Sequence, residues 1–292
     1  MPPRARWGLL AAVFFWAVSM IAAKVALASA PPLTVAALRL LIAALCFAGL
    51  FVLRGLGPKR SGGRAFAALF GLSLLGTGLH YGFLTIGLQF TTAAHGSIYS
   101  AMGPIFIVLI AAAAGQRVTL RQAAGIALAL CGALAIQGLG ALRAFDLRGR
   151  LLGDALVLLS ILMWGLFTVF GQRVVARIGP LAAIGWTTII GAIWMLPVAG
   201  AEMAVRSFAP AAISLQGWLS IAFLGIGCTF LAPLFYFIAL EHAPASKVSV
   251  YLYAVPPLTY VLAALFLKEP IGVDLLIGSV LVLGGVYLTE RG

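Results

Sequence analysis

The chain has 292 residues; 63% of them are aliphatic, aromatic or sulfur-containing, and 9% are charged. About a quarter of the residues of a soluble domain are charged, so this chain cannot form the polar surface of a soluble protein of its length. Disorder is excluded as well, because the chain is far too apolar. Its apolar residues suffice for about ten helices of about 20 residues each, the length that crosses a lipid bilayer.

The net charge of +12 is spread between apolar runs and does not gather beside aromatic residues. Positive charge at the cytoplasmic ends of membrane helices explains this distribution better than nucleic-acid binding does, so no nucleic acid is expected as a partner. Three cysteines, Cys46, Cys131 and Cys228, lie inside apolar runs without metal-ligand spacing. We interpret them as buried hydrophobic residues and expect neither a metal nor a cofactor.

The apolar runs predict ten membrane helices, all in one multi-pass chain. The first run follows a basic segment and resembles a signal peptide. A retained helix is favoured, because the run of Trp7–Ala23 is long for a signal sequence and belongs to the internal repeat described below. Turn signals such as Pro31-Pro32, Gly179-Pro180 and Pro270 separate the later runs. The predicted spans are 7–28, 33–53, 65–90, 93–115, 120–139, 152–174, 180–201, 215–240, 243–267 and 270–289.

The basic residues predict the orientation of these spans. With the N-terminus inside, eleven Lys and Arg residues fall in cytoplasmic segments and five in outer ones, the bias expected of cytoplasmic loops. The exception is the linker 140–151, which carries Arg143, Arg148 and Arg150 and lies outside in this topology. We therefore predict a protein of the bacterial inner membrane with both termini in the cytoplasm.

A weak internal repeat relates the two halves of the chain. Each half holds five predicted helices, and an odd number inverts the second copy relative to the first. Inverted repeats around a central site at mid-membrane are typical of secondary transporters. We predict a first repeat at 1–139, the linker at 140–151 and a second repeat at 152–292. The equivalent positions are Trp16 and Trp164, Pro32 and Pro180, Pro104 and Pro257, Gly125 and Gly278, Gly132 and Gly285, and the strings LLGTG and FLGIG.

Two equivalent prolines fall in the middle of predicted spans, Pro104 in the fourth and Pro257 in the ninth. A proline there removes a backbone hydrogen bond and kinks the helix. The freed carbonyl groups then need a partner or a wet cavity within the membrane. We predict a pair of hinges beside the substrate path; static kinks that serve helix packing are the alternative.

Several segments resemble the drug/metabolite transporter superfamily in its tandem EamA-domain form. They are Trp16, Lys24, Pro31-Pro32 and Arg39, with FLTIGLQFTTAAHGSIYSAMGPIF in the first half and YFIALEHAPASKVSVYLYAVPPL in the second. The resemblance covers nearly the whole chain and implies ten helices and a transport function. Overall similarity points further to the YddG-like amino-acid exporters. Gln116 stands where the second half has Glu269, so the halves differ at that helix end.

Polar and aromatic residues near span centres are candidate substrate contacts, because polar groups are costly in lipid. Trp16 and Trp164 occupy equivalent positions, and His80 is the imidazole nearest mid-depth. An aromatic cavity with a few hydroxyl groups suits amphipathic metabolites, and aromatic faces suit cationic groups. Each of these side chains could instead pack or bond a helix carbonyl. The candidates are Trp16, His80, Tyr81, Tyr99, Trp164, Thr168 and Tyr251, with Ser19, Thr77, His95, Met102 and Lys247 beside them.

Two cations inside predicted spans are assigned structural roles. Lys24 lies near the end of the first span, where it could extend to the membrane surface. Arg39 lies six residues into the second span and needs a carbonyl, a water or an acid as partner. All seven acids lie in loops or near span ends, which gives no support to strong coupling to Na⁺ or protons. Facilitated transport, exchange and weak proton coupling through His80 stay open.

These features predict a secondary transporter that works by alternating access. Its expected cargo is an amino acid, with aromatic amino acids among the candidates, or a related small metabolite exported across the inner membrane. A multidrug exporter of lipophilic cations is the alternative, although the sequence places no acid at mid-depth that could bind a cation. An intramembrane enzyme is disfavoured, because the sequence has no HExxH or GxSxG motif. The expected partners are this small molecule and the lipid bilayer; the oligomeric state is left open, with a monomer as one option.

Overall fold

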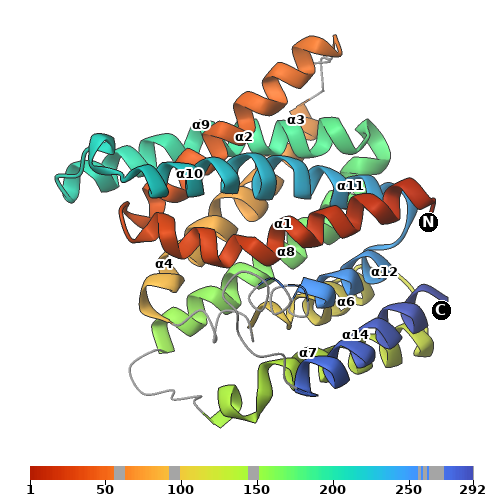
Figure 1. The fold of residues 1–292 in the computed structure, drawn as a ribbon. Coiled ribbons are helices and arrows are strands. Elements are labelled where there is room, and N and C mark those ends of the chain that lie inside the picture. The colour runs from red at the N-terminus through yellow and green to blue at the C-terminus, as the bar shows by residue number, and fades with distance from the viewer. Residues whose placement is uncertain are drawn as a thin grey trace.

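The computed structural model is a bundle of helices (Figure 1) and describes residues 1–55, 63–91, 99–143, 151–255, 258, 262 and 273–291. These residues contain no β-strand. The first half contains α1 (Pro3–Leu27), α2 (Pro32–Leu53), α3 (Gly63–Ser73), η1 (Leu74–Leu79), α4 (His80–Phe90), α6 (Gly103–Ala113) and α7 (Leu120–Arg143). The second contains α8 (Leu151–Ile178), α9 (Pro180–Val205), η2 (Pro210–Ala212), α10 (Leu215–Phe223), η3 (Leu224–Leu231), α11 (Ala232–His242), α12 (Ala245–Ser249), η4 (Val250–Ala254) and α14 (Val273–Arg291).

Six helical stretches of the described residues are long and apolar enough to cross a membrane. They are Pro3–Leu27, Pro32–Leu53, Phe66–Phe90, Leu151–Ile178, Pro180–Val205 and Leu215–His242, with shorter apolar helices at Gly103–Ala113, Leu120–Ala135 and Ile277–Thr289. The spans predicted at 93–115 and 243–267 extend into residues outside the description. A total of ten crossings in two repeats therefore stays a prediction. Helix α7 continues to Arg143, into the segment assigned to the linker.

Prolines set where several helices begin. Pro3, Pro32 and Pro180 occupy the first turns of α1, α2 and α9, where a missing N–H group costs no hydrogen bond. Pro104 has the same place in α6, which begins at Gly103 after a turn at residues 101–102. The fourth predicted span is thus interrupted just before Pro104 and does not bend as one continuous helix. Pro257, its predicted counterpart, lies outside the described residues.

Wide π-helical turns interrupt one long helix in each half. They are η1, with the sequence LLGTGL, and η3, with LGIGCTFL. η1 contains the string LLGTG, and η3 begins at the second residue of FLGIG, the string that the repeat aligned with it. Glycines bring both segments against helices of the opposite half: Gly76 and Gly78 lie against Phe167 and Trp194, and Gly225 and Gly227 against Ile42 and Phe15. Since π turns are rare and concentrate at functional sites, the pair marks the region where the halves meet.

The last helices of the two halves, α7 and α14, lie side by side (Figure 1) and run antiparallel. A Cβ atom at Gly132 would lie 2.6 Å from the carbonyl oxygen of Gly278, and one at Gly285 would lie 2.4 Å from that of Gly125. Only residues without a side chain permit this approach, a common basis of helix association in lipid. These four glycines are the ones that the internal repeat aligned, Gly125 with Gly278 and Gly132 with Gly285.

Substituting a glycine of this contact should destabilise the protein. A leucine at Gly132 meets backbone atoms that cannot rotate away, so Gly132→Leu should cost about 1–3 kcal/mol and lower the melting temperature of the detergent-purified protein by several degrees. Gly49→Leu is the matched control, because an added Cβ at Gly49 meets no atom within 4 Å. Equal melting temperatures for the two variants would contradict the close approach.

Candidate functional site

Three aromatic rings from both halves meet at the centre of the bundle. Trp16 of α1 and Trp164 of α8 are arranged edge to face, with ring centroids 5.6 Å apart. Tyr236 of α11 lies 5.5 Å from Trp16 and 5.7 Å from Trp164, so each ring contacts the other two. The indole N–H of Trp16 donates to the carbonyl oxygen of Cys228 in η3, at 3.3 Å. We call these three rings the aromatic cluster.

His80 and Tyr81 extend the aromatic cluster on one side. The His80 ring lies 5.3 Å from Trp164 and 4.8 Å from Tyr81, both measured between centroids. Its Nδ1 lies 2.9 Å from the carbonyl oxygen of Ser160. A carbonyl only accepts, so Nδ1 carries the proton of this bond, and Nε2 of the neutral ring is left as an acceptor.

Arg39 of α2 lies beyond Tyr81 and is 3% exposed. Its guanidinium carbon lies 4.1 Å from the centroid of the Tyr81 ring, a cation–π contact. Its Nε donates to the hydroxyl of Thr229 in η3, at 2.8 Å. The predicted need for a partner is therefore met by a hydroxyl and a ring. These contacts form a row of side chains that joins α2, α4 and α8; in order, it contains Arg39, Tyr81, His80 and Trp164.

Two buried hydroxyl groups beside the aromatic cluster lack a hydrogen-bond partner among the described residues. They belong to Thr168, one turn after Trp164 in α8, and to Tyr236. Both residues are fully buried, and the two hydroxyls lie near one another without hydrogen-bonding geometry. An unsatisfied buried hydroxyl costs free energy, so this pair is available to a polar group that enters between the helices.

The other predicted contacts are distributed differently. Tyr251 is buried in the same apolar core as Trp164 and Tyr236. Tyr99 lies apart from them and hydrogen-bonds Asp154 in the first turn of α8. His95 lies outside the described residues. Because the central rings contact one another, their side chains fill this region.

Partly buried side chains cap two helix ends in an equivalent way. The ammonium group of Lys24 donates to the carbonyl oxygens of Leu88 and Thr91, at 3.2 and 3.4 Å. The Lys24 ammonium group therefore turns toward the end of α4, while the side chain stays partly exposed. In the second half, the amide of Gln172 donates to the carbonyl oxygens of Leu240 and Ala243, at 3.1 and 2.9 Å. Gln172 is 148 residues after Lys24, the separation of Trp16 and Trp164.

The two caps lie at opposite ends of the bundle. Helix α1 runs antiparallel to α10–α11, since Gly8 lies against Phe235 and Trp16 bonds Cys228 (Figure 1). Lys24 therefore lies at one end, and the α11 terminus that Gln172 caps lies at the other. At the Lys24 end, Thr91 also donates to the buried carboxylate of Asp154. At the Gln172 end, the amide of Gln116 donates to Gln172 at 3.0 Å. The Lys24 cap is thus charged and the Gln172 cap neutral.

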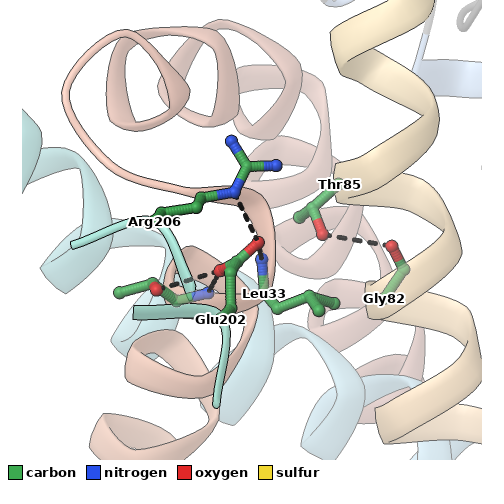
Figure 2. Close-up of polar contacts among 6 residues, drawn as sticks. Leu33, Gly82, Thr85, Glu202 and Arg206 are labelled. Carbon is green, nitrogen blue, oxygen red and sulfur yellow. Dashed lines mark hydrogen bonds and ion pairs between the residues drawn. The ribbon is translucent and has the colours of Figure 1, made fainter. Parts of the chain in front are cut away.

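Glu202, near the end of α9, caps the start of α2 (Figure 2). Its carboxylate accepts from the backbone N–H groups of Leu33 and Thr34, at 3.2 and 2.8 Å, and from the Thr34 hydroxyl at 3.0 Å. Arg206 lies 3.8 Å away as a partly exposed counter-ion. The first N–H groups of a helix lack internal partners and favour a negative charge. Glu202 also lines a pocket of about 470 Å³ at this end, separate from the aromatic cluster.

Sequence reasoning missed Tyr236, Thr229 and Gln172. The repeat could have found Gln172, because the separation that relates the two tryptophans carries Lys24 onto it. Nothing comparable marks Tyr236 and Thr229, whose importance comes from contacts between helices distant in sequence. The acids were predicted to lie in loops or near the ends of spans, and Asp154 and Glu202 do lie near helix ends.

The EamA-like transporter family matches residues 5–137 and again residues 151–291. The chain belongs to the EamA-like transporter family. A membrane transporter of small molecules is the activity that this membership supports, and each matched stretch covers one predicted half. The finer resemblance to YddG-like exporters has no such support.

Several relatives that are named as transporters match this chain over most of their length. An "Uncharacterized transporter" of Archaeoglobus fulgidus is 29% identical over 98% of this chain and 99% of its own. "Uncharacterized transporter YoaV" of Bacillus subtilis is 29% identical over 96% and 94%. "Uncharacterized inner membrane transporter YedA" of Escherichia coli is 26% identical over 85% and 78%. A solved crystal structure shares the fold with a TM-score of 0.80 at 20% identity, over 98% of this chain and 97% of that one.

Removing the Glu202 carboxylate should weaken the contact between α9 and α2. Glu202→Ala leaves two backbone N–H groups without an acceptor and should cost about 1 kcal/mol of stability, the usual effect of losing a helix cap. Thermal unfolding of the detergent-purified protein measures it. Glu241→Ala, at an exposed position, is the control. A melting temperature unchanged by Glu202→Ala would mean that water caps α2 equally well.

Proposed function

We propose that the protein is a secondary transporter that exports amino acids, aromatic ones among the candidates, or related small metabolites across the bacterial inner membrane. Ten helices in two inverted repeats would carry the substrate by alternating access, with both termini in the cytoplasm. The observation that supports this proposal best is the aromatic cluster at the junction of the halves, where a buried cation and two unpaired hydroxyls also lie. Such surroundings suit a small molecule that is both polar and apolar.

The proposed roles follow from these contacts. Trp16, Trp164 and Tyr251 would enclose the apolar part of the substrate, and Thr168 and His80 would meet its polar groups. Tyr81 would contact the substrate and hold the Arg39 guanidinium. Tyr99, bonded to Asp154, would act at the end of the path. Pro104 and Pro257 stay candidate hinges. The π turns η1 and η3 are further candidates, because a helix can change its winding there.

The two helix-end caps support alternating access. In the predicted orientation, the Lys24 cap closes the outer end and the Gln172 cap closes the inner end. Each cap joins a helix to its neighbour through two hydrogen bonds, and breaking one cap at a time would open one side at a time. The buried Arg39 counts against lipophilic cations as cargo, because like charges repel.

Reconstituted liposomes test the proposal. The purified protein should raise the flux of at least one of the twenty amino acids above that of empty vesicles. A screen across all twenty is needed, since the aromatic cluster defines the cargo only in chemical class. Flux of none of them would contradict amino-acid transport.

Substitutions at the cluster should lower transport without preventing insertion. His80→Ala removes the ring between Tyr81 and Trp164, and Trp164→Ala removes the ring that contacts Trp16, His80 and Tyr236; each should lower flux about tenfold or more. Trp7→Ala is the control, because Trp7 is 73% exposed. Membrane yield and melting temperature report insertion and folding. Normal flux in both variants would place the path elsewhere.

Removing one cap should expose the centre from one side. Cys228 is buried beside Trp16 and is a native reporter in a background without Cys46 and Cys131. Lys24→Met should raise its labelling by a membrane-impermeant thiol reagent added outside. Gln172→Leu should raise labelling by reagent added inside. Equal labelling of the two variants from both sides would contradict the proposal that each cap closes one end of the path.

A further inference from the structure

Arg39 keeps most of its hydrogen-bonding capacity unused. A guanidinium group has five N–H donors, and its Nε is the donor that bonds Thr229. No acceptor among the described residues takes the four N–H groups of its outer fork. The flat face is covered by Tyr81 at 4.1 Å, which stabilises the charge but uses none of these donors.

Arg39 also lacks a counter-ion among the described residues. The two buried carboxylates are engaged at helix ends, Asp154 with Thr91 and Glu202 with the start of α2. The neighbours of Arg39 are the neutral groups Tyr81, Thr229 and Cys228, with the His80 ring next to Tyr81. An unpaired permanent cation inside a membrane protein is costly, and such residues mark functional sites.

The position of Arg39 connects it to the aromatic cluster. Thr229, its hydrogen-bond partner, directly follows Cys228, whose carbonyl oxygen bonds the Trp16 indole. The Arg39 guanidinium also lies over the ring of Tyr81. Tyr81 contacts His80, and His80 contacts Trp164. The unpaired hydroxyls belong to Tyr236, one of the rings of the cluster, and to Thr168, one turn after Trp164 in α8. A cation, a set of rings and a pair of hydroxyls are thus brought together at the junction of the halves.

We propose that Arg39 binds the carboxylate group of the transported molecule and makes the protein selective for small carboxylates. This inference rests on the proposed transport function and adds the chemical group that the site recognises. The guanidinium fork matches a carboxylate through two parallel hydrogen bonds, which a lysine cannot reproduce. The apolar part of the substrate packs on the rings, and its remaining polar group faces the two hydroxyls.

Competition in liposomes tests the selectivity of the wild-type protein directly. The probe is a radiolabelled amino acid that the screen finds transported, and the competitors are the same unlabelled amino acid and its carboxamide. The carboxamide keeps the amine and the side chain but has no carboxylate. The acid should compete about tenfold better or more, because a charged fork loses its partner in the amide. Equal competition would overturn the inference and leave transport itself standing.

Variants then assign the selectivity to Arg39. Arg39→Gln should lower flux of the acid about tenfold or more and abolish the preference over the amide. Arg39→Lys should raise the KM for the acid more than it lowers the maximal rate, because the charge stays and the fork is lost. Arg206→Gln removes a cation at a helix end and should leave the preference unchanged. If Arg39→Gln fails to fold, the Lys variant and the wild-type competition still decide the question.

Each outcome separates the two proposals. Flux of none of the twenty amino acids through the wild-type protein overturns the proposed function. Flux with full acid preference in Arg39→Gln overturns the role of Arg39 alone. Loss of flux with an unchanged preference in Arg39→Lys, together with a lowered melting temperature, would mean that Arg39 only holds α2 against α4 and η3, and would also overturn it.

Discussion

The structure depends on one constraint: a polar group buried away from water must find its partner inside the protein. Helix ends present this problem most sharply, because their last carbonyls and first N–H groups have no partner within the helix. Lys24 and Gln172 meet it for the ends of α4 and α11, and Glu202 meets it for the start of α2. These side chains come from neighbouring helices, so satisfying each helix end also fixes how the helices pack.

The same constraint explains why the centre is suited to bind. The end caps account for the buried acids, which leaves Arg39 without a carboxylate among the described residues and leaves Thr168 and Tyr236 without hydrogen bonds. Two of the unsatisfied buried groups, the hydroxyls of Thr168 and Tyr236, therefore lie beside the tryptophan pair. The π turns η1 and η3 bring glycines of each half against the other half at this level. If the proposed function holds, binding and movement would involve the same region.

Helix positions could be predicted closely, because apolar runs and prolines act locally. Helices α2, α8 and α9 begin within one residue of the predicted spans. The tryptophan pair was predictable from the repeat, but its partner Tyr236 was not, since helix rotation and contacts between distant segments decide it. The hydrogen bond of Tyr99 to Asp154 was not predictable either, because it joins segments that are distant in sequence. The π turns have no periodic signature, although the repeated strings LLGTG and FLGIG marked their place.

The glycine contact between α7 and α14 has a consequence for how the chain is assembled. Each half contributes its last helix to this contact, and the four glycines let the two backbones approach closely. Two separately translated pieces, divided between residues 143 and 151, should find each other in the bilayer through this seam.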